Sequence, residues 1–343
     1  MPNPQRPDRL SAARLPTPIE PLSRVGRSLT DGGGDLWVKR DDQTGFVLGG
    51  NKIRKLEYSF AEAKKRGADT VLTCGGFDSN HCRATTYFAR RHGLEPVLLL
   101  RTPDGKPVSD PQGNTLLNQI ADATIEWVTP DEYRRGVPRL EESAERHRSA
   151  GRNVFVIPEG ASDALGALGF AHAAEELAEQ ERSLDRPFDI IVHAVGSGGT
   201  SAGLQAGRDA LDRPWEIWGV PVCDDGAYFR EKVTEIRAGL CDLAGLPEER
   251  PDTDRYIEGA QGRGYGLSTP EELRAAQTLA REEGILVDPC YTGKAWCGLL
   301  QAIESGDIPR GARVLFWHTG GAFANFSHAS SWGEVLGQRA PST

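Results

Sequence analysis

Short apolar runs alternate with longer amphipathic segments along most of the chain. The apolar runs predict buried strands at residues 36–40, 70–74, 96–100, 125–128, 154–157, 188–195, 216–222 and 313–317. The segments between several of these runs predict helices at about 51–60, 82–92, 114–121, 131–149, 162–179, 201–208 and 269–284. Strands that alternate with helices are typical of parallel sheets covered by helices. The pattern therefore predicts an α/β fold.

The two ends of the chain lack this alternation. Residues 1–34 are rich in proline and glycine and predict an extended arm, followed by a loop at 31–34. Residues 339–343 predict a frayed tail.

Composition narrows the function classes. The 343 residues are enough for two domains or one large one. A net charge of −9 argues against nucleic acid or an anionic membrane as the main partner, because both attract basic surfaces. The start has no hydrophobic signal core, and no run approaches a membrane span. The six cysteines form no CxxC pair, so we expect no metal site and a cytoplasmic protein with reduced thiols.

A lysine stands at the start of the first long helix. Gly49 and Gly50 allow a sharp bend, Asn51 can cap the helix, and Lys52 follows. A cation at a helix N-terminus interacts unfavourably with the helix dipole, so the presence of a lysine there calls for an explanation. One interpretation is a solvated surface lysine. The other is a nucleophilic amine of the Schiff-base type, made neutral by desolvation and by the charges of residues 54 and 55.

A glycine-rich turn is the strongest local signal for a ligand. Residues 196–200, GSGGT, follow a buried strand and open a helix, where backbone N–H groups favour an anion such as phosphate. The turn has neither the P-loop pattern nor the GxGxxG spacing of dinucleotide-binding folds. The alternative is a tight strand-to-helix turn without a ligand.

Two further motifs carry candidate ligand groups. Ser79, Asn80 and His81 follow a strand end and open a helix, whose first N–H groups could hold a carboxylate with Ser79 and His81 as donors; the alternative is an ordinary helix cap at Ser79. Tyr265 and Tyr291 lie in glycine-flanked loops and could act as acid, base or hydrogen-bond donor, although a packed aromatic ring is the commoner role of a tyrosine.

Taken together, the motifs resemble the D-cysteine desulfhydrase / 1-aminocyclopropane-1-carboxylate deaminase family of pyridoxal-phosphate (PLP) enzymes. The resemblance extends from about residue 15 to residue 326. It is carried in order by VKRDD (38–42), GGNKIRKLE (49–57), CGGFDSNH (74–81), GSGGTSAGL (196–204), GYG (264–266), DPCYTGKA (288–295) and HTGG (318–321).

The resemblance implies a role for each motif. Lys52 looks like the Schiff-base lysine, and the implied catalytic residues are Lys52, Ser79, Tyr265 and Tyr291. The implied cofactor-binding residues are Lys52, Asn80 at the ring oxygen, Gly196, Ser197, Gly198, Gly199 and Thr200 at the phosphate, and Thr319 at the pyridine nitrogen. The implied substrate-binding residues are Ser79, Asn80 and His81 at the carboxylate, with Tyr265 and Tyr291 on the substrate side.

The resemblance also implies the tryptophan-synthase-β-like architecture, fold type II, with two open parallel-sheet domains covered by helices. A large PLP-binding domain would comprise residues 1–52 and 161–343, and a small α/β domain, residues 53–160, would be inserted between them. The cofactor would lie in the cleft, and a homodimer is expected.

Two threonines favour one branch of the family. The deaminase pattern has Glu and Leu where this chain has Thr292 and Thr319. A carboxylate at the ring nitrogen keeps it protonated and makes the ring a strong electron sink, which a hydroxyl does not. A weaker sink suffices when a thiolate leaves from the β-carbon. We therefore expect D-cysteine desulfhydrase activity, with a small amino acid as substrate.

Two departures from the family pattern concern the substrate. The family usually has Gln at Asp78 and Pro at Phe323, and Asn325 is unusual nearby. The Asp78 carboxylate could repel an acidic substrate, recruit an amino group, be protonated or be turned away. Alternative functions are deamination of 1-aminocyclopropane-1-carboxylate, elimination from cysteate or chloroalanine, or a reaction of a diamino acid. Alternatives of another class are a non-catalytic PLP- or amino-acid-binding protein and a nucleotide-binding protein without PLP.

Overall fold

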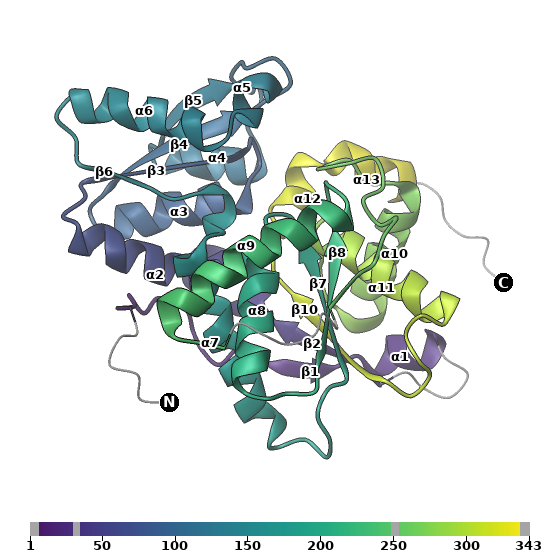
Figure 1. Ribbon diagram of the computed structural model, residues 1–343. Coiled ribbons are helices and arrows are strands. Elements are labelled where there is room, and N and C mark those ends of the chain that lie inside the picture. The colour runs from purple at the N-terminus through teal and green to yellow at the C-terminus, as the bar shows by residue number, and fades with distance from the viewer. Residues whose placement is uncertain (1–6, 30–34, 248–253, 337–343) are drawn as a thin grey trace.

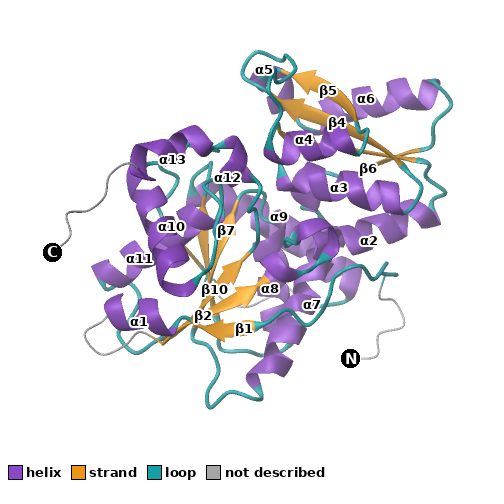
Figure 2. Ribbon diagram, turned by 180° about the vertical axis from the view of Figure 1, so that it is seen from behind, coloured by secondary structure: helices purple, strands orange, loops and turns teal. Residues whose placement is uncertain are grey.

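A computed structural model describes residues 7–29, 35–247 and 254–336. Two sheets form the framework, and each lies among its own helices (Figures 1 and 2). The larger sheet has the order β1 (Ile19–Pro21), β2 (Asp35–Arg40), β10 (Arg313–His318), β7 (Ile190–Val195), β8 (Glu216–Pro221), β9 (Arg255–Tyr256). The smaller sheet has the order β5 (Thr124–Val128), β4 (Glu95–Arg101), β3 (Thr70–Gly76), β6 (Val154–Val156).

The strand pairings are parallel except for β1, which runs antiparallel to β2 at the sheet edge. All eight predicted strands form, so the predicted α/β fold with two parallel sheets is confirmed. The segment predicted as an extended arm contains β1 and also a helix, α1 (Ser23–Leu29), which the sequence did not predict. The predicted loop at 31–34 and the predicted frayed tail lie outside the described residues.

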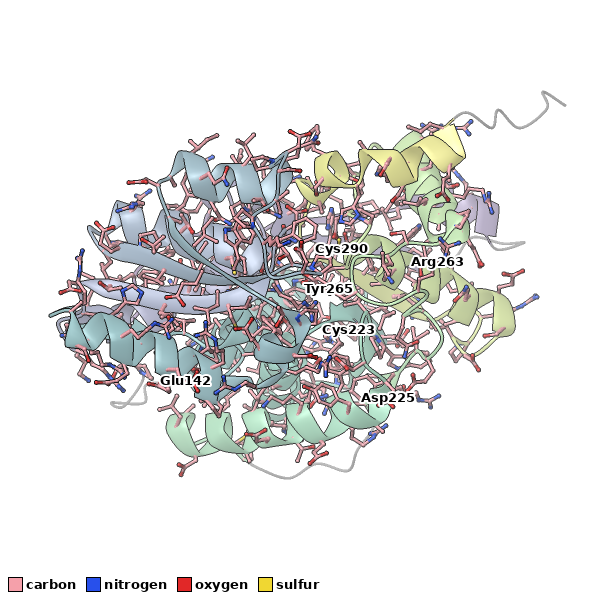
Figure 3. The ribbon with its side chains drawn as sticks, turned by 90° about the horizontal axis from the view of Figure 1, so that it is seen from above. Glu142, Cys223, Asp225, Arg263, Tyr265 and Cys290 are labelled. Carbon is pink, nitrogen blue, oxygen red and sulfur yellow. The ribbon has the colours of Figure 1, made fainter. Side chains whose placement is uncertain are left out.

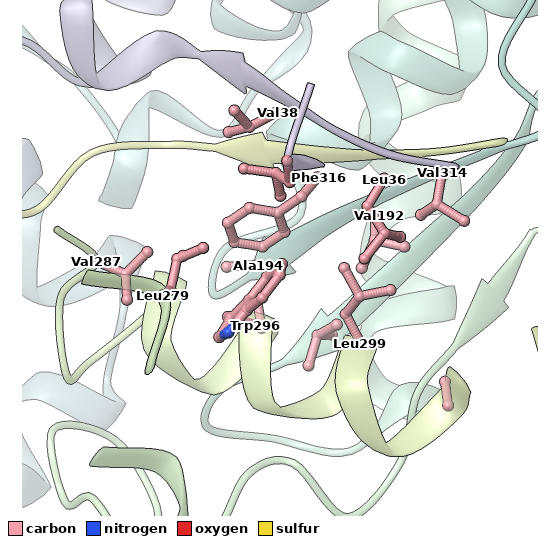
Figure 4. Packing of buried hydrophobic residues seen from close by; sticks show 14 of the residues in the cluster. Leu36, Val38, Val192, Ala194, Leu279, Val287, Trp296, Leu299, Val314 and Phe316 are labelled. Carbon is pink, nitrogen blue, oxygen red and sulfur yellow. The ribbon is translucent and has the colours of Figure 1, made fainter. Parts of the chain in front are cut away.

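Both faces of the larger sheet are buried. Along β10, Val314 and Phe316 belong to the core beneath α11 (Thr292–Ser305), while Leu315 and Trp317 belong to the core beneath α7 (Ala164–Glu181). The ring of Phe316 meets that of Trp296 edge to face, with centroids 5.4 Å apart (Figure 4). Burial on both faces explains why these strands are continuous apolar runs rather than alternating patterns.

The helices divide between the two sheets. Those on one side of the larger sheet are α1, α10 (Pro270–Glu283), α11 and α13 (Ala329–Leu336). Those on its other side are α7, α8 (Gly199–Ala210) and, packed on these two, α9 (Gly226–Ala244). The smaller sheet lies among α2 (Lys52–Lys65), α3 (Asn80–Arg91), α4 (Gly113–Ile120), α5 (Pro130–Arg134) and α6 (Val137–Ser149), with α12 (Ala324–Ser327) next to α4. Short 3₁₀ turns occupy Asp41–Gln43, Phe46–Leu48 and Glu159–Ala161.

Helix α2 joins the two halves of the molecule. Phe60 packs against Phe88 of α3, with ring centroids 4.6 Å apart, whereas Tyr58 lies in a cluster with residues of α7. Arg54 on the same helix forms buried ion pairs with Asp41 and with Glu176 of α7, at 2.8 and 2.9 Å. Breaking such a buried pair on one side is strongly destabilising, because a charge is left unpaired. The helix that begins at Lys52 is therefore held firmly from both sides.

Three local expectations need correction. The helix expected over 131–149 is two helices, because Gly136 adopts a left-handed φ of +59° and Pro138 follows it. Asn51 precedes α2 but its side chain makes no cap hydrogen bond. Helix α9 was missed, although Asp225 caps its start and Gly245, at φ +62°, ends it; these two residues were the available signal. Among the described helices, none combines the length and the apolar composition that crossing a membrane requires.

Candidate active site

A cavity lies where the carboxyl ends of β7 and β10 meet the starts of helices α2, α3 and α8. In parallel α/β sheets this is the edge at which ligands bind. The predicted site residues that line the cavity are Lys52, Ser79, Asn80, His81, Gly196, Ser197, Gly198, Thr200, Tyr291 and Thr319. Gly199 and Tyr265 are the two predicted residues that do not line it. The structure therefore brings almost all of the predicted residues together.

A strained turn places Lys52 at this cavity. Gly49 and Gly50 have φ values of +76° and +112°, so the predicted bend is confirmed. A Cβ on Gly49 would lie 1.8 Å from the carbonyl oxygen of Asp42, so no other residue fits there. Val47 just before them has φ +35°, a conformation that costs roughly 1–3 kcal/mol. Such strain is typical of functional sites.

The amine of Lys52 is made less basic by its surroundings. Its Nζ donates a hydrogen bond to Oδ1 of Asn51, at 3.0 Å. Burial lowers the pKa of Lys52 to about 8; the nearby cation Arg83 lowers it further, while the carboxylates of Asp288 and Glu159 act in the opposite direction. The amine is therefore partly neutral near neutral pH, as a nucleophile or base requires.

The cation that helps to lower the pKa of Lys52 is Arg83, and the sequence had suggested residues 54 and 55 instead. Arg54 is directed away into its ion pairs with Asp41 and Glu176. Arg83 of α3 instead donates to the carbonyl oxygens of Val47 and Gly49, at 2.9 and 3.3 Å, and so grips the turn before Lys52.

The glycine-rich turn is backed by a lysine that sequence reasoning missed. Gly198 has φ +84°, and helix α8 begins at Gly199. Lys55 is fully buried and donates to Oγ of Ser162 and to the carbonyl oxygen of Gly160, at 3.0 and 3.2 Å. A Cβ at Gly199 would lie 2.7 Å from the Lys55 Nζ. Burial, together with the nearby Lys52, lowers the pKa of Lys55 well below its usual value. A buried amine donor beside a helix N-terminus fits a phosphate monoester. The available signal was its position, one helical turn after Lys52.

Two serines support the same turn. The hydroxyls of Ser162 and Ser197 are hydrogen-bonded at 2.7 Å, and the backbone N–H of Gly199 donates to Oγ of Ser162, at 3.2 Å. Thr200 accepts from Nδ2 of Asn51, at 3.2 Å, which connects the turn to the lysine helix. Hydroxyl groups therefore surround this turn.

The start of α3 offers both backbone and side-chain donors to the cavity. Oγ of Ser79 accepts from the N–H of Cys82, at 3.3 Å, so the interpretation as a helix cap is confirmed. Its own hydroxyl hydrogen remains available, as do the first N–H groups of the helix. Oδ1 of Asn80 accepts from Asn114, at 2.9 Å, which orients that side chain. A carboxylate is the ligand that this arrangement suits.

His81 presents an acceptor rather than a donor. The hydroxyl of Thr73 gives its hydrogen to the carbonyl oxygen of Ile157, at 2.7 Å, so it accepts from Nε2 of His81, at 2.8 Å. Burial holds the pKa of His81 well below its ordinary value, and the ring is neutral. Nδ1 is then an unprotonated, buried atom without a hydrogen-bond partner among the described residues. Such an atom in a cavity wall points to a ligand that supplies a hydrogen.

The two candidate tyrosines contact each other. The hydroxyl of Tyr291 donates to that of Tyr265, at 2.8 Å, and the rings are 5.6 Å apart at 77°. Burial raises the pKa of both well above the ordinary value, so both are protonated at neutral pH. Gly196 and Gly76 make room for them, because a Cβ at either would lie 2.9 Å from a tyrosine ring. Figure 3 shows Tyr265 between Cys290 and Cys223, near the centre of the molecule.

The residues that distinguish the branches of the family differ in exposure. Thr319 lines the cavity. Thr292 is fully buried, and its hydroxyl donates to Oδ1 of Asp288, at 2.6 Å. Asp288 also accepts from the backbone N–H groups of residues 290, 291 and 292, and burial raises its pKa. Only one of the two threonine hydroxyls is therefore available to a ligand.

The departures at Asp78 and Phe323 do not reach the cavity. Asp78 accepts from the N–H of Asn114, at 2.7 Å, and from the hydroxyl of Ser327. Of the alternatives for this carboxylate, the structure supports two: it is turned away from the cavity, and burial raises its pKa, which favours the protonated form. The ring of Phe323 lies 5.0 Å from the guanidinium of Arg83. Asn325 donates to the carbonyl oxygen of residue 287, at 3.2 Å.

Comparisons with known proteins agree with the resemblance found in the sequence. The family described as "Pyridoxal-phosphate dependent enzyme" matches residues 10–320. A putative 1-aminocyclopropane-1-carboxylate deaminase of Thermotoga maritima is 40% identical over 322 residues, which is 94% of this chain and 98% of that protein. A D-cysteine desulfhydrase of Serratia proteamaculans is 37% identical over 324 residues, 93% of this chain and 96% of that protein. The crystal structure of an ACC deaminase homologue is 33% identical, with a TM-score of 0.85 over 97% of this chain and all of that one.

Proposed function

Because this chain belongs to the family of pyridoxal-phosphate-dependent enzymes, we propose that it catalyses β-elimination from D-cysteine, releasing pyruvate, sulfide and ammonia. The predicted resemblance, the predicted fold type and the predicted cofactor are confirmed by the family match and the structural likeness. One observation supports the site assignment above the others. The weakly basic amine of Lys52 and the anion-binding turn at 196–200 open on the same cavity.

The residues around the cavity fit PLP. Lys52 would hold its aldehyde carbon, the turn at 196–200 with Lys55 would hold its phosphate, and Thr319 would face its ring nitrogen. The unpartnered Nδ1 of His81 and the side chain of Asn80 provide polar contacts on the remaining wall. When bound, PLP withdraws electrons from the α-carbon of an amino acid and so makes the α-proton acidic.

Different residues of the chain then bind the substrate, accept its α-proton and assist the leaving group. The hydroxyl of Ser79 and the first N–H groups of α3 bind the substrate carboxylate and orient the α-hydrogen. The amine of Lys52 accepts that proton, for which a pKa of about 8 is suitable. The Cβ–S bond breaks with its electron pair on sulfur, and the tyrosine pair supplies a hydrogen bond or a proton there. Tyr265 is the better proton donor, because Tyr291 gives its own hydrogen to Tyr265.

The choice of D-cysteine over a cyclopropane rests on Thr319. A hydroxyl facing the ring nitrogen does not keep it protonated, and a thiolate leaves without the stronger electron sink that ring opening needs. The buried hydroxyl of Thr292 does not alter this, since it is used by Asp288. Deamination of 1-aminocyclopropane-1-carboxylate is the second candidate, because several relatives carry that name.

The decisive experiment is product release from the PLP-loaded protein. Stoichiometric sulfide and pyruvate from D-cysteine, and not from L-cysteine, would establish both reaction and stereochemistry. 2-Oxobutyrate from 1-aminocyclopropane-1-carboxylate would instead favour the second candidate. A yellow protein that releases none of these would refute both substrates while leaving the cofactor in place.

The domain boundaries, the cellular location and the oligomeric state are also part of this proposal. Residues 1–52 and 161–343 form the large domain and 53–160 the small one, in line with the separate sheets. The protein acts in the cytoplasm as a homodimer. Limited proteolysis and sedimentation would test the boundaries and the oligomer.

A further inference from the structure

A second hollow adjoins the cavity at the carboxyl end of β4. The two spaces share Glu159, Gly196 and Ser197 in their walls. Tyr265 lines the second one, together with Cys223, and Figure 3 shows both on the side where the small sheet faces the large one. Tyr291 lines the first space and Tyr265 the second, so the tyrosine pair lies where the two spaces adjoin.

Arg101, the last residue of β4, projects its guanidinium into this hollow. Its Cζ lies 4.8 Å from the ring centroid of Tyr133 and 5.5 Å from that of Tyr265. The backbone beneath it is held by a hydrogen bond from the N–H of Phe77 to its carbonyl oxygen, at 3.0 Å. Contacts with ring faces hold the guanidinium in place but use none of its five N–H donors.

The charge of Arg101 has no counterion in contact. Among the described residues no carboxylate forms an ion pair with Arg101 within 4.0 Å. Glu159 and Asp224 line the same hollow, and burial raises the pKa of Glu159 overall, although the charge of Arg101 lowers that pKa. The two other cations there do have partners. Arg134 pairs with Asp131, three residues earlier on its own helix, and Lys232 pairs with Glu235, 3.0 Å away on α9.

A positioned guanidinium with free donors is suited to a planar anion. Its forked N–H groups match a carboxylate or sulfonate better than any neutral group. The location matters as well, because the phosphate site and the proposed α-carboxylate site lie in the neighbouring cavity. An anion at Arg101 would therefore be a third one, carried at the far end of the ligand.

We propose that Arg101 is the specificity residue of a side-chain subsite, which takes β-substituted amino acids whose leaving group ends in a carboxylate or sulfonate. This inference rests on the proposed β-elimination. For S-carboxymethylcysteine, Lys52 takes the α-proton, the Cβ–S bond breaks with the electron pair on sulfur, and the sulfur takes a proton. With one water the products are pyruvate, ammonia and mercaptoacetate, and no oxidant or reductant is needed.

The test compares two isosteric compounds that differ in charge. S-carboxymethylcysteine and S-carbamoylmethylcysteine, each as both enantiomers, are given to the PLP-loaded wild type, to Arg101→Met and to Arg134→Met. Binding is measured by calorimetry and pyruvate release by steady-state kinetics. Arg134 is the matched control, since it lines the same hollow but is 73% exposed and already paired.

We expect the wild type and Arg134→Met to prefer the carboxylate compound at least tenfold in both binding and kcat/KM. Arg101→Met should bind the two compounds equally, and Arg101→Lys, which retains the charge without the fork, should fall between. A wild type that does not distinguish the compounds, or an Arg101→Met that still does, overturns the subsite.

D-cysteine turnover is measured on the same preparations. If D-cysteine is not cleaved but the binding preference depends on Arg101, the proposed function fails and the subsite stands. If D-cysteine is cleaved and the preference is absent, the subsite fails and the function stands. A loss of folded protein in Arg101→Met leaves the decision to Arg101→Lys, whose binding preference must then be weaker than that of the wild type.

Discussion

The hydroxyl of Tyr291 donates to the hydroxyl of Tyr265 across 2.8 Å, and this contact connects the cavity beside Lys52 to the hollow beside Arg101. Its direction leaves Tyr265 with a hydrogen to give. In the proposed reaction the pair would stand between the reacting carbon and the space into which the leaving group departs.

Replacing Tyr265 by Phe should lower kcat for D-cysteine by about 100-fold, the scale of a lost general acid. Tyr291→Phe should lower it less, because it removes only the hydrogen bond that positions Tyr265. Tyr87→Phe serves as the control, since that hydroxyl bonds a carbonyl oxygen on α4, away from the cavity. Steady-state kinetics would measure the three variants. Turnover within twofold of the wild type in both cavity variants would contradict the role of the pair.

The reactivity of Lys52 should follow a low pKa. Because burial lowers that pKa to about 8, the neutral amine predominates above this pH and is lost as the pH falls through it. In cofactor-free protein, labelling by an amine-reactive ester, located by mass spectrometry, should therefore reach half its maximal rate near pH 8. Lys52→Ala should remove that labelling and also the visible band of the PLP-loaded protein.

The same labelling tests the influence of Arg83. Its cation lowers the pKa of Lys52, so Arg83→Met should move the midpoint to higher pH. A midpoint that stays in place would mean that burial alone sets the pKa. A wild-type midpoint near that of a free lysine would contradict the site as a whole.

Lys55→Met should weaken PLP binding. The buried amine now bonds Ser162 and Gly160, and a charge-assisted bond to phosphate contributes about 1.5–3 kcal/mol. The dissociation constant of PLP should therefore rise roughly tenfold to a hundredfold. Fluorescence titration of cofactor-free protein measures this, with Lys64→Met, an exposed lysine on the same helix, as control. Equal affinity in both variants would argue that Lys55 is structural.

Asp78→Ala should affect stability and not specificity. It removes the acceptor for the buried N–H of Asn114 and for the hydroxyl of Ser327, which should cost about 1–3 kcal/mol. Urea unfolding would show the loss, and the exposed Asp104→Ala should not. The ratio of kcat/KM values for different substrates should stay unchanged. A changed ratio would show that the carboxylate acts on the substrate after all.

Much of the fold was predictable because buried strands appear in the sequence as uninterrupted apolar runs. Runs such as 188–195 are apolar without interruption, since both faces of the sheet are covered. Helices α1, α9, α11, α12 and α13 were missed, and tertiary packing explains part of this. Helix α11, for example, begins at Thr292 without a side-chain cap, inside a motif that already had another interpretation.

The sequence by itself determined the features of the local backbone: the glycine bend before Lys52, the glycine-rich turn at 196–200 and the donor-rich start of α3. Each depends on residues adjacent in the chain, so their spacing was sufficient. Only the tertiary structure decided which distant charge acts on which group. It directs Arg83 rather than Arg54 toward the lysine turn, turns Asp78 away and places Arg101 beside Tyr265 with no ion pair within 4.0 Å among the described residues. Such relationships depend on how separate elements pack against one another. They cannot be inferred from the spacing of residues along the chain.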